Sequence, residues 1–146
     1  MVLFLDIDGV LHPNVVHDSK LLLVHLPALE EVLRARQAVD VVISSTWRIT
    51  RTLDELRALF SIDIAPRLIG VTPQWRDIQD EANWGTYVRQ TEVEAWLRTN
   101  GRVWEDWVAL DDQNALFRPF CKHLVQTCPA TGLDDTSLAE LLKRLE

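Results

Sequence analysis

Short apolar runs alternate with segments of helical periodicity along the whole chain, and this alternation restricts the fold more than any other feature. Five runs are candidate strands: residues 2–5, 39–43, 68–71, 107–110 and 123–127. The first two are continuously apolar, as strands buried on both faces would be, and the third is a weaker example. Strands separated by helices favour a parallel sheet with helices on both faces. We therefore expect a single α/β domain over residues 1–146, built as a three-layer sandwich around a five-stranded parallel sheet.

The segments between these runs carry apolar residues at helical spacing. They define candidate helices over residues 26–33, 53–60, 93–97 and 137–145. Thr52 with Glu55 fits a capping box for the second helix, and Ser137 with Glu140 fits one for the last. Gly101 is a stop signal after the third. The order strand, helix, strand, helix supports the parallel sheet.

Composition and charge narrow the class of protein. Hydrophobic residues make up 47% of the chain and charged residues 25%, which argues against a disordered protein. The net charge of -7 argues against a broad nucleic-acid surface but leaves room for a pocket that holds one phosphate. Cys121 and Cys128 form neither a disulfide scaffold nor a zinc pattern, so no disulfide-linked partner is expected. The first residues resemble neither a signal peptide nor a membrane span, so we expect a cytoplasmic protein without a membrane partner.

Carboxylates directly follow two of the apolar runs. Asp6 and Asp8 come after the first run, and Asp111 and Asp112 come after the fourth. In open parallel sheets, ligands bind outside the carboxyl ends of the strands, where the strand order reverses. Bare carboxylates at that place would repel one another by about 4 kcal/mol per pair at roughly 4 Å. A magnesium ion bound by these four aspartates removes this cost and is the favoured interpretation over solvated aspartates in turns.

The first acidic pair also fits covalent catalysis. A nucleophile needs a neighbouring acid or base that assists the leaving group and later activates water. Asp6 and Asp8 are two residues apart, so both can point toward one crevice. Gly9 permits a sharp turn directly after them.

Donors for phosphate oxygens follow the second apolar run. Ser44, Ser45 and Thr46 offer hydroxyls and backbone amides to a transferring phosphoryl group. Arg48 and Arg89 offer guanidinium groups whose fork matches phosphate oxygens. We predict that Ser45, Thr46 and Arg48 bind substrate.

These stretches resemble, in order, the four motifs of the haloacid dehalogenase (HAD) superfamily. The matching segments are FLDIDGVLHP, VVISSTWR, Arg89 ahead of an amphipathic helix, and VALDDQ, which together span residues 2–113. The stretch from Arg89 through Glu92 to Trp96 and Leu97 is similar to the HAD-like domain associated with RNA-repair proteins. The resemblance implies a Rossmann-like fold and phosphatase chemistry.

The resemblance also implies a role for each matched position. Asp6 would be the nucleophile and a magnesium ligand, and Asp8 the general acid and base, with its backbone carbonyl bound to magnesium. Ser44 would bind the transferring phosphoryl group. Arg89, where lysine is commoner in the superfamily, would stabilise the nucleophile and the phosphate. The acidic pair at residues 111–112 would complete the magnesium site.

The connections predict little or no cap over the site. The segments after Gly9 and after Val71 are too short for a separate cap domain, so we expect Asp6 to be reachable from solvent. Residues 14–20 could form a short hairpin flap, and His12 is interpreted as a loop residue that orders it.

Three tryptophans are not explained by the core. Trp75 and Trp84 lie in a polar loop without strand or helix periodicity, where they could stack on a base or pack in the interior. Arg76 beside them could add a phosphate contact. For Trp47, ahead of Arg48, both roles stay open.

The favoured function is magnesium-dependent hydrolysis of a phosphomonoester through a phospho-aspartate on Asp6. A nucleotidase or nucleic-acid end-repair phosphatase is an alternative on the same fold, with a nucleotide or nucleic-acid end as the phosphorylated substrate. An alternative from another class is a non-catalytic, phosphoryl-responsive regulatory domain, because receiver domains also place acidic residues at strand ends. Asp8 argues against it, since a slow receiver lacks this acid–base group.

Overall fold

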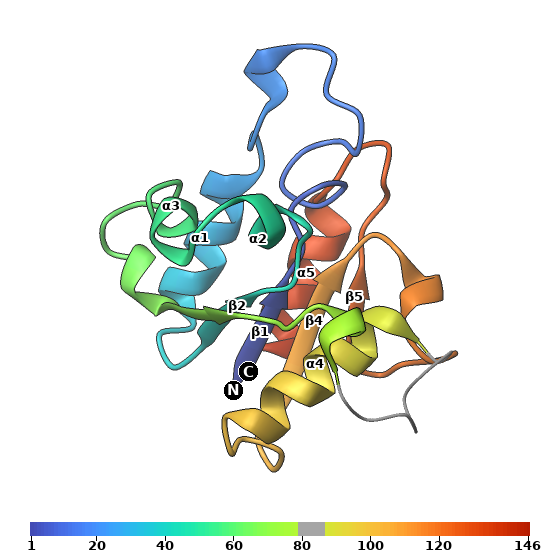
Figure 1. Ribbon diagram of the computed structural model, residues 1–146. Coiled ribbons are helices and arrows are strands. Elements are labelled where there is room, and N and C mark those ends of the chain that lie inside the picture. Colours follow the sequence, from blue (N-terminus) through green and yellow to red (C-terminus); the bar gives the residue numbers. More distant parts are fainter. Residues whose placement is uncertain (79–86) are drawn as a thin grey trace.

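The chain forms an open parallel sheet in the order β3-β2-β1-β4-β5, as seen in a computed structural model that describes residues 1–78 and 87–146 (Figure 1). The strands of these residues are β1 (Val2–Leu5), β2 (Asp40–Ile43), β3 (Leu68–Val71), β4 (Trp107–Asp111) and β5 (Leu124–Gln126). All neighbouring strands pair in parallel. The α/β class and the five-stranded parallel sheet expected from the sequence are confirmed, with strand ends within one residue of the prediction.

Helices cover both faces of the sheet, which makes the three expected layers. The α-helices of the described residues are α1 (Leu26–Ala35), α2 (Trp47–Thr50), α3 (Leu53–Arg57), α4 (Val88–Thr99) and α5 (Asp135–Arg144). Short 3₁₀ helices are η1 (Ser19–Leu21), η2 (Ala65–Arg67), η3 (Trp75–Asp77) and η5 (Asn114–Leu116). Figure 1 shows α4 in front of the sheet and α5 behind it. None of the helices in the described parts of the chain has the length and apolar character that a membrane span requires.

The central strand β1 is anchored on both faces. Leu3 and Leu5 pack into the cluster under α1 and α5, whereas Val2 and Phe4 pack under α4. Phe4 also meets the ring of Trp96 edge-on at 5.7 Å. Each buried apolar side chain contributes roughly 1.5–3 kcal/mol. This packing fixes the end of β1 and therefore the position of the residue that follows it.

The carboxyl edge of the sheet holds the residues that follow β1, β2 and β3. The amide of Asp6 donates to Leu110 O (3.0 Å), and the amide of Ser44 donates to Leu5 O (2.9 Å). Strand order reverses between β1 and β4, because β2 lies on one side of β1 and β4 on the other. Asp6, which follows β1, therefore lies at the switch point, where open parallel sheets bind their ligands.

The cap of the last helix differs from the sequence prediction. The carboxylate of Asp134 accepts the amide of Ser137 (2.8 Å), and the hydroxyl of Ser137 accepts the amide of Asp134 (2.9 Å). Helix α5 therefore begins at Asp135, and the predicted box of Ser137 with Glu140 is wrong. The capping box of Thr52 with Glu55 at α3 is confirmed.

Residues 13–24 form an irregular loop beyond the carboxyl edge, seen at the top of Figure 1. The expected hairpin over residues 14–20 is wrong, because the carboxylate of Asp18 accepts the amide of Lys20 (3.0 Å) and starts the 3₁₀ helix η1 instead. Within residues 1–78 and 87–146 no folded domain lies over this edge, in agreement with the expected fold with little or no cap.

Candidate active site

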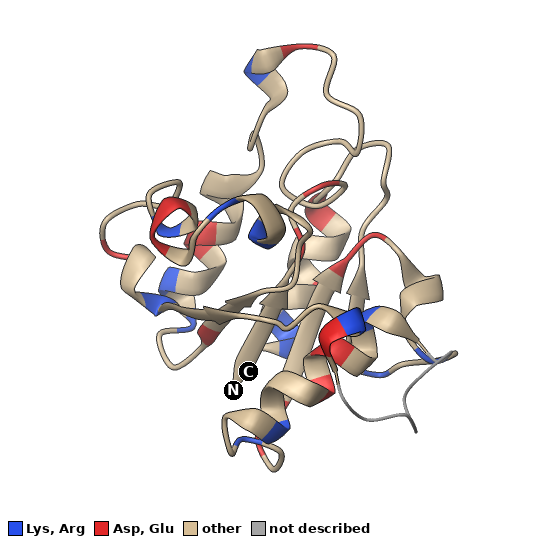
Figure 2. Ribbon diagram, in the orientation of Figure 1, with Lys and Arg blue, Asp and Glu red and all other residues tan. Residues whose placement is uncertain are grey.

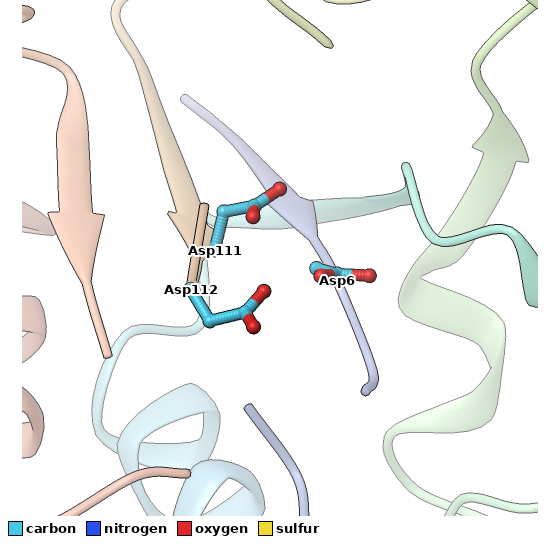
Figure 3. Close-up of side chains that lie close together, drawn as sticks. All are labelled: Asp6, Asp111 and Asp112. Atoms are coloured by element: carbon cyan, nitrogen blue, oxygen red, sulfur yellow. The ribbon is translucent and has the colours of Figure 1, made fainter. Parts of the chain in front are cut away.

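Three carboxylates meet at the switch point of the sheet. Asp6 follows β1, Asp111 ends β4 and Asp112 comes next, and one oxygen of each lies within 4.8 Å of the others. All three residues are buried, with exposed fractions of 4%, 1% and 5%. Figure 3 shows the side chains of Asp111 and Asp112 on the side of the strand that faces Asp6, and Figure 2 shows the acidic segment after the arrow of β4. The predicted acidic cluster therefore forms from these residues, while the side chain of Asp8 lies outside it.

The cluster has the properties of a cation site. Burial raises the pKa of Asp6 to about 6 and that of Asp111 to about 7, although the nearby Arg89 acts in the opposite direction. The Oδ1 atom of Asp112 is buried and has no hydrogen-bond partner among the residues that the structure describes. Close, incompletely neutralised carboxylate oxygens are the ligands that magnesium prefers. The residues present therefore fit a magnesium ion.

Arg89 brings a positive charge to this cluster from the first turn of α4. Its Nη1 atom donates to Asp111 Oδ2 (2.8 Å) and lies 3.5 Å from Asp6 Oδ1. The Arg89 side chain is only 7% exposed. The structure thus places Arg89 beside Asp6, the predicted nucleophile, and Asp111.

Arg48, predicted to bind substrate, is committed to the protein itself. Its guanidinium nitrogens donate to the carbonyl oxygens of Ser44, Ser45, Thr72 and Pro73 and to the carboxylate of Glu92. The side chain is 4% exposed. This geometry favours a structural role for Arg48, which joins the ends of β2 and β3 to α4, over direct contact with a phosphate.

The residues after β2 differ in their accessibility. Ser44 and Ser45 are buried, and Thr46 is exposed. The hydroxyl of Ser45 accepts the amide of Trp47 (3.2 Å), so it shapes the turn into α2. Ser44 sits one strand away from Asp6, since its amide is paired with the last residue of β1. Of these three residues, Thr46 is the one exposed to solvent.

Asp8 has two hydrogen-bond donors that the sequence did not reveal. His12 Nε2 lies 2.7 Å from Asp8 Oδ1, and Trp47 Nε1 lies 3.2 Å from both Asp8 oxygens. The Asp8 side chain is 39% exposed, whereas His12 is 1% exposed. The proximity of His12 to Asp8 in the sequence is a signal that could have suggested the first contact, but nothing in the sequence links Trp47 to Asp8.

Glu92 is a second residue whose function the sequence did not reveal. It accepts from Arg48 Nη2 (2.7 Å) and from the amide of Trp75 (2.8 Å), and its Oε1 lies 3.6 Å from Arg89 Nε. The sequence signal for its contact with Arg89 is the spacing of three residues, which places both side chains on the same face of a helix. Glu92 therefore connects α4 to α2 and η3 around the site.

Asp6 is less accessible than the sequence analysis predicted. The expectation that solvent reaches it is wrong in this conformation, because the residue is 4% exposed. The guanidinium of Arg89, 3.5 Å from Asp6 Oδ1, and the carboxylate of Asp112 lie beside the buried side chain of Asp6.

A cavity of about 240 Å³ lies beside Arg89, between α2, η3 and the start of α4. Its walls include Thr46, Ile49, Trp75, Arg76, Val88 and Arg89. The side chain of Ile49 is 50% exposed and that of Val88 is 36% exposed. Trp75 thus lines a cavity next to the acidic cluster, while Trp84 lies outside the described residues.

A comparison with known protein families found a match over most of the chain. The family model described as "HAD domain in Swiss Army Knife RNA repair proteins" matches residues 2–138. The search of curated proteins and the search of solved structures each found no significant match. The match covers all of the residues in the acidic cluster as well as Arg89.

Proposed function

The chain belongs to the family of HAD domains found in Swiss Army Knife RNA repair proteins, and on this premise we propose that it is a magnesium-dependent phosphomonoester hydrolase that acts through a phospho-aspartate on Asp6. The observation that carries the proposal is the arrangement of Asp6 with Asp111, Asp112 and Arg89 at the switch point of the sheet.

The two aspartates of the first motif divide the chemistry. A carboxylate oxygen of Asp6 bonds to phosphorus while the bond from phosphorus to the ester oxygen breaks, and that oxygen takes a proton from Asp8. Asp8 then accepts a proton from water, whose oxygen bonds to phosphorus. The bond between phosphorus and Asp6 breaks, which releases phosphate and restores both side chains.

The remaining residues hold charge and substrate in place. Arg89 and the loop at residues 44–46 offer donors for the phosphoryl oxygens. Asp6, Asp111 and Asp112 would hold the magnesium ion, which would supply positive charge to the phosphoryl group.

The proposal is tested with a panel of phosphomonoesters in magnesium and in excess chelator. Turnover should require magnesium, and Asp6→Asn should remove both turnover and the acid-stable phosphoryl adduct seen by mass spectrometry. Asp8→Asn should lose about 10²–10⁴-fold in turnover but keep an adduct on Asp6 when the leaving group is good. Asp106→Asn, an exposed aspartate just before β4, is the control and should behave as wild type.

The outcomes separate this proposal from the other class of function. Normal turnover of Asp6→Asn would contradict the covalent mechanism. A phospho-Asp6 that forms on the wild type and persists without turnover would instead identify a phosphoryl-responsive regulatory domain.

One observation favours a nucleotide or a nucleic-acid end as the substrate within this activity. The cavity beside Arg89 offers the indole of Trp75 and the exposed guanidinium of Arg76. Its volume of about 240 Å³ is below the roughly 300–1,000 Å³ of pockets that enclose drug-sized ligands. It therefore suits one base next to the phosphate better than a longer segment, in keeping with the RNA-repair description of the family.

A further inference from the structure

The carboxylate of Asp8 is held at both oxygens by two side chains from different parts of the chain. Trp47 Nε1, from the start of α2, donates to Oδ1 and Oδ2 at 3.2 Å each. His12 Nε2 contacts Oδ1 at 2.7 Å. An exposed aspartate usually samples several rotamers, and each staggered well is open to it. Here two directional contacts restrict the orientation of the carboxylate although the side chain is 39% exposed.

The other nitrogen of His12 determines which way this hydrogen bond runs. The amide of Leu23 donates to His12 Nδ1 (3.1 Å), so Nδ1 is an acceptor and carries no proton. A neutral imidazole then bears its proton on Nε2. His12 therefore donates from Nε2 to Asp8 Oδ1, and both partners of Asp8 are donors.

The backbone of Leu23, whose amide donates to His12, has an unfavourable conformation. Leu23 has φ of 55°, in the left-handed region that bulky side chains rarely adopt. Such a conformation costs on the order of 1–3 kcal/mol and persists only where its surroundings hold it. The hydrogen bond from the amide of His25 to Leu11 O (2.9 Å) fixes the loop on the far side of Leu23. Leu23, held in this strained conformation, thus donates its N–H to His12, which in turn contacts Asp8.

We propose that His12 and Trp47 are positioning residues that hold the Asp8 carboxylate in the orientation needed for proton transfer. The inference rests on the proposed function, in which Asp8 is the acid and base. Within residues 1–78 and 87–146, Oδ1 accepts from both His12 and Trp47, whereas Oδ2 accepts only from Trp47, at the longer distance. Oδ2 is therefore the oxygen with room for the transferred proton. Through Leu23, the loop at residues 13–24 is part of this support.

Three substitutions separate positioning from a structural role. Trp47→Phe keeps an aromatic ring and removes the N–H donor. His12→Gln places an amide near the position of Nε2 and can still donate to Asp8, whereas His12→Asn places one near Nδ1 and keeps only the contact with Leu23. Each variant is compared on an aryl phosphate with a good leaving group and on an alkyl phosphate with a poor one.

Loss of positioning should depend on the leaving group. A poor leaving group needs the proton of Asp8, and general acid catalysis supplies typically about 10²–10⁴-fold. Trp47→Phe and His12→Asn should therefore lose at least about tenfold more kcat on the alkyl phosphate than on the aryl phosphate. With the aryl phosphate, phospho-Asp6 should accumulate, because activation of water is impaired. His12→Gln should restore part of the loss.

The control is His25→Asn, since the ring of His25 holds the same region through Thr131 O (2.7 Å) without touching Asp8. It should change both substrates equally, without accumulation of phospho-Asp6. Equal losses on both substrates in Trp47→Phe and His12→Asn would overturn the positioning role and leave a structural one. Absence of any phosphatase activity in the wild type would instead reject the proposed function itself.

Discussion

Arg48 and Glu92 form a buried ion pair, with 2.7 Å between Nη2 and Oε2 and side chains that are 4% and 6% exposed. Burial lowers the pKa of Arg48 and raises that of Glu92, because desolvation disfavours both charged forms. The charge of each residue partly offsets this effect on its partner. Arg48 also reaches backbone carbonyls at the ends of β2 and β3. The pair therefore joins the loop that follows β2 to helix α4, which carries Arg89.

Breaking this pair from one side should strongly destabilise the protein. Arg48→Met leaves the carboxylate of Glu92 buried without its main partner, which typically costs about 3–5 kcal/mol. The free energy of unfolding, from urea titration, should fall by that amount. Arg34→Met is the matched control, because Arg34 and Asp63 form an exposed pair at 2.7 Å, and such pairs contribute about 0–1 kcal/mol.

A loss of similar size in both variants would show that burial does not decide the strength of the Arg48 pair. The double variant Arg48→Met with Glu92→Leu extends the test. It should recover part of the loss, since replacement of a buried pair by apolar groups is often tolerated.

The fold and the acidic cluster could be predicted because their signals are local. The run before Asp6 and the run before Asp111 are buried on both faces, so the sequence there is continuously apolar and its end is visible. Parallel topology then brings the two ends together without any knowledge of side-chain contacts. The same argument placed Ser44 at this edge.

The partners of the site residues could not be predicted, because they depend on contacts distant in sequence. Arg48 meets Glu92 across 44 positions, and Trp47 meets Asp8 across 39. A guanidinium bound to backbone carbonyls and one free for phosphate look the same in a sequence. The burial of Asp6, which is 4% exposed, likewise depends on side-chain packing that a sequence does not show.

Gly9 should be essential for the geometry of the cation site. Its φ is 74°, and a Cβ at this position would lie 2.3 Å from Asp112 Oδ2. Gly9→Ala must therefore displace the carboxylate of Asp112. We expect magnesium affinity, measured by calorimetric titration, to fall at least about tenfold, in the range found when partners that orient metal ligands are lost.

Gly101→Ala is the control for backbone strain. Gly101 also has a positive φ, of 66°, but a Cβ there would meet no atom within 4 Å. Both substitutions carry the left-handed cost of roughly 1–2 kcal/mol, and only Gly9→Ala should weaken magnesium binding. Unchanged affinity in Gly9→Ala would remove Asp112 from the proposed metal ligands.

Trp75 should favour substrates that carry a base. If its indole stacks on a base in the cavity beside Arg89, Trp75→Ala should lower kcat/KM for a nucleotide by at least about fivefold more than for a small aryl phosphate, since stacking contributes about 1–3 kcal/mol per base. Trp104→Ala is the control, because Trp104 is 79% exposed and lies ahead of β4, outside this cavity. Equal losses on both substrates would assign Trp75 to packing.

The raised pKa values of the acidic cluster predict an unusual pH dependence of stability without metal. Burial raises the pKa of Asp6 from 3.8 to about 6 and that of Asp111 from 3.8 to about 7. At pH values between 3.8 and about 7, the folded protein therefore binds more protons than the unfolded chain. Its stability therefore falls as pH rises, in contrast to the usual behaviour of paired carboxylates. This stabilising contribution is complete below about pH 4 and is lost as pH rises through about 7.

Magnesium should reverse this dependence, because it binds the ionised cluster and competes with protons. Urea unfolding in chelator should give a lower free energy of unfolding at pH 7.5 than at pH 5.5. Added magnesium should stabilise the protein more at pH 7.5 than at pH 5.5, since binding to the folded state adds stability in proportion to the logarithm of the ligand concentration over Kd. In Asp111→Asn, which lacks one of the two titrating carboxyls, the fall in metal-free stability between these pH values should be smaller. A metal-free stability that rises over this interval, to the same extent in both proteins, would show that the cluster does not take up protons on folding.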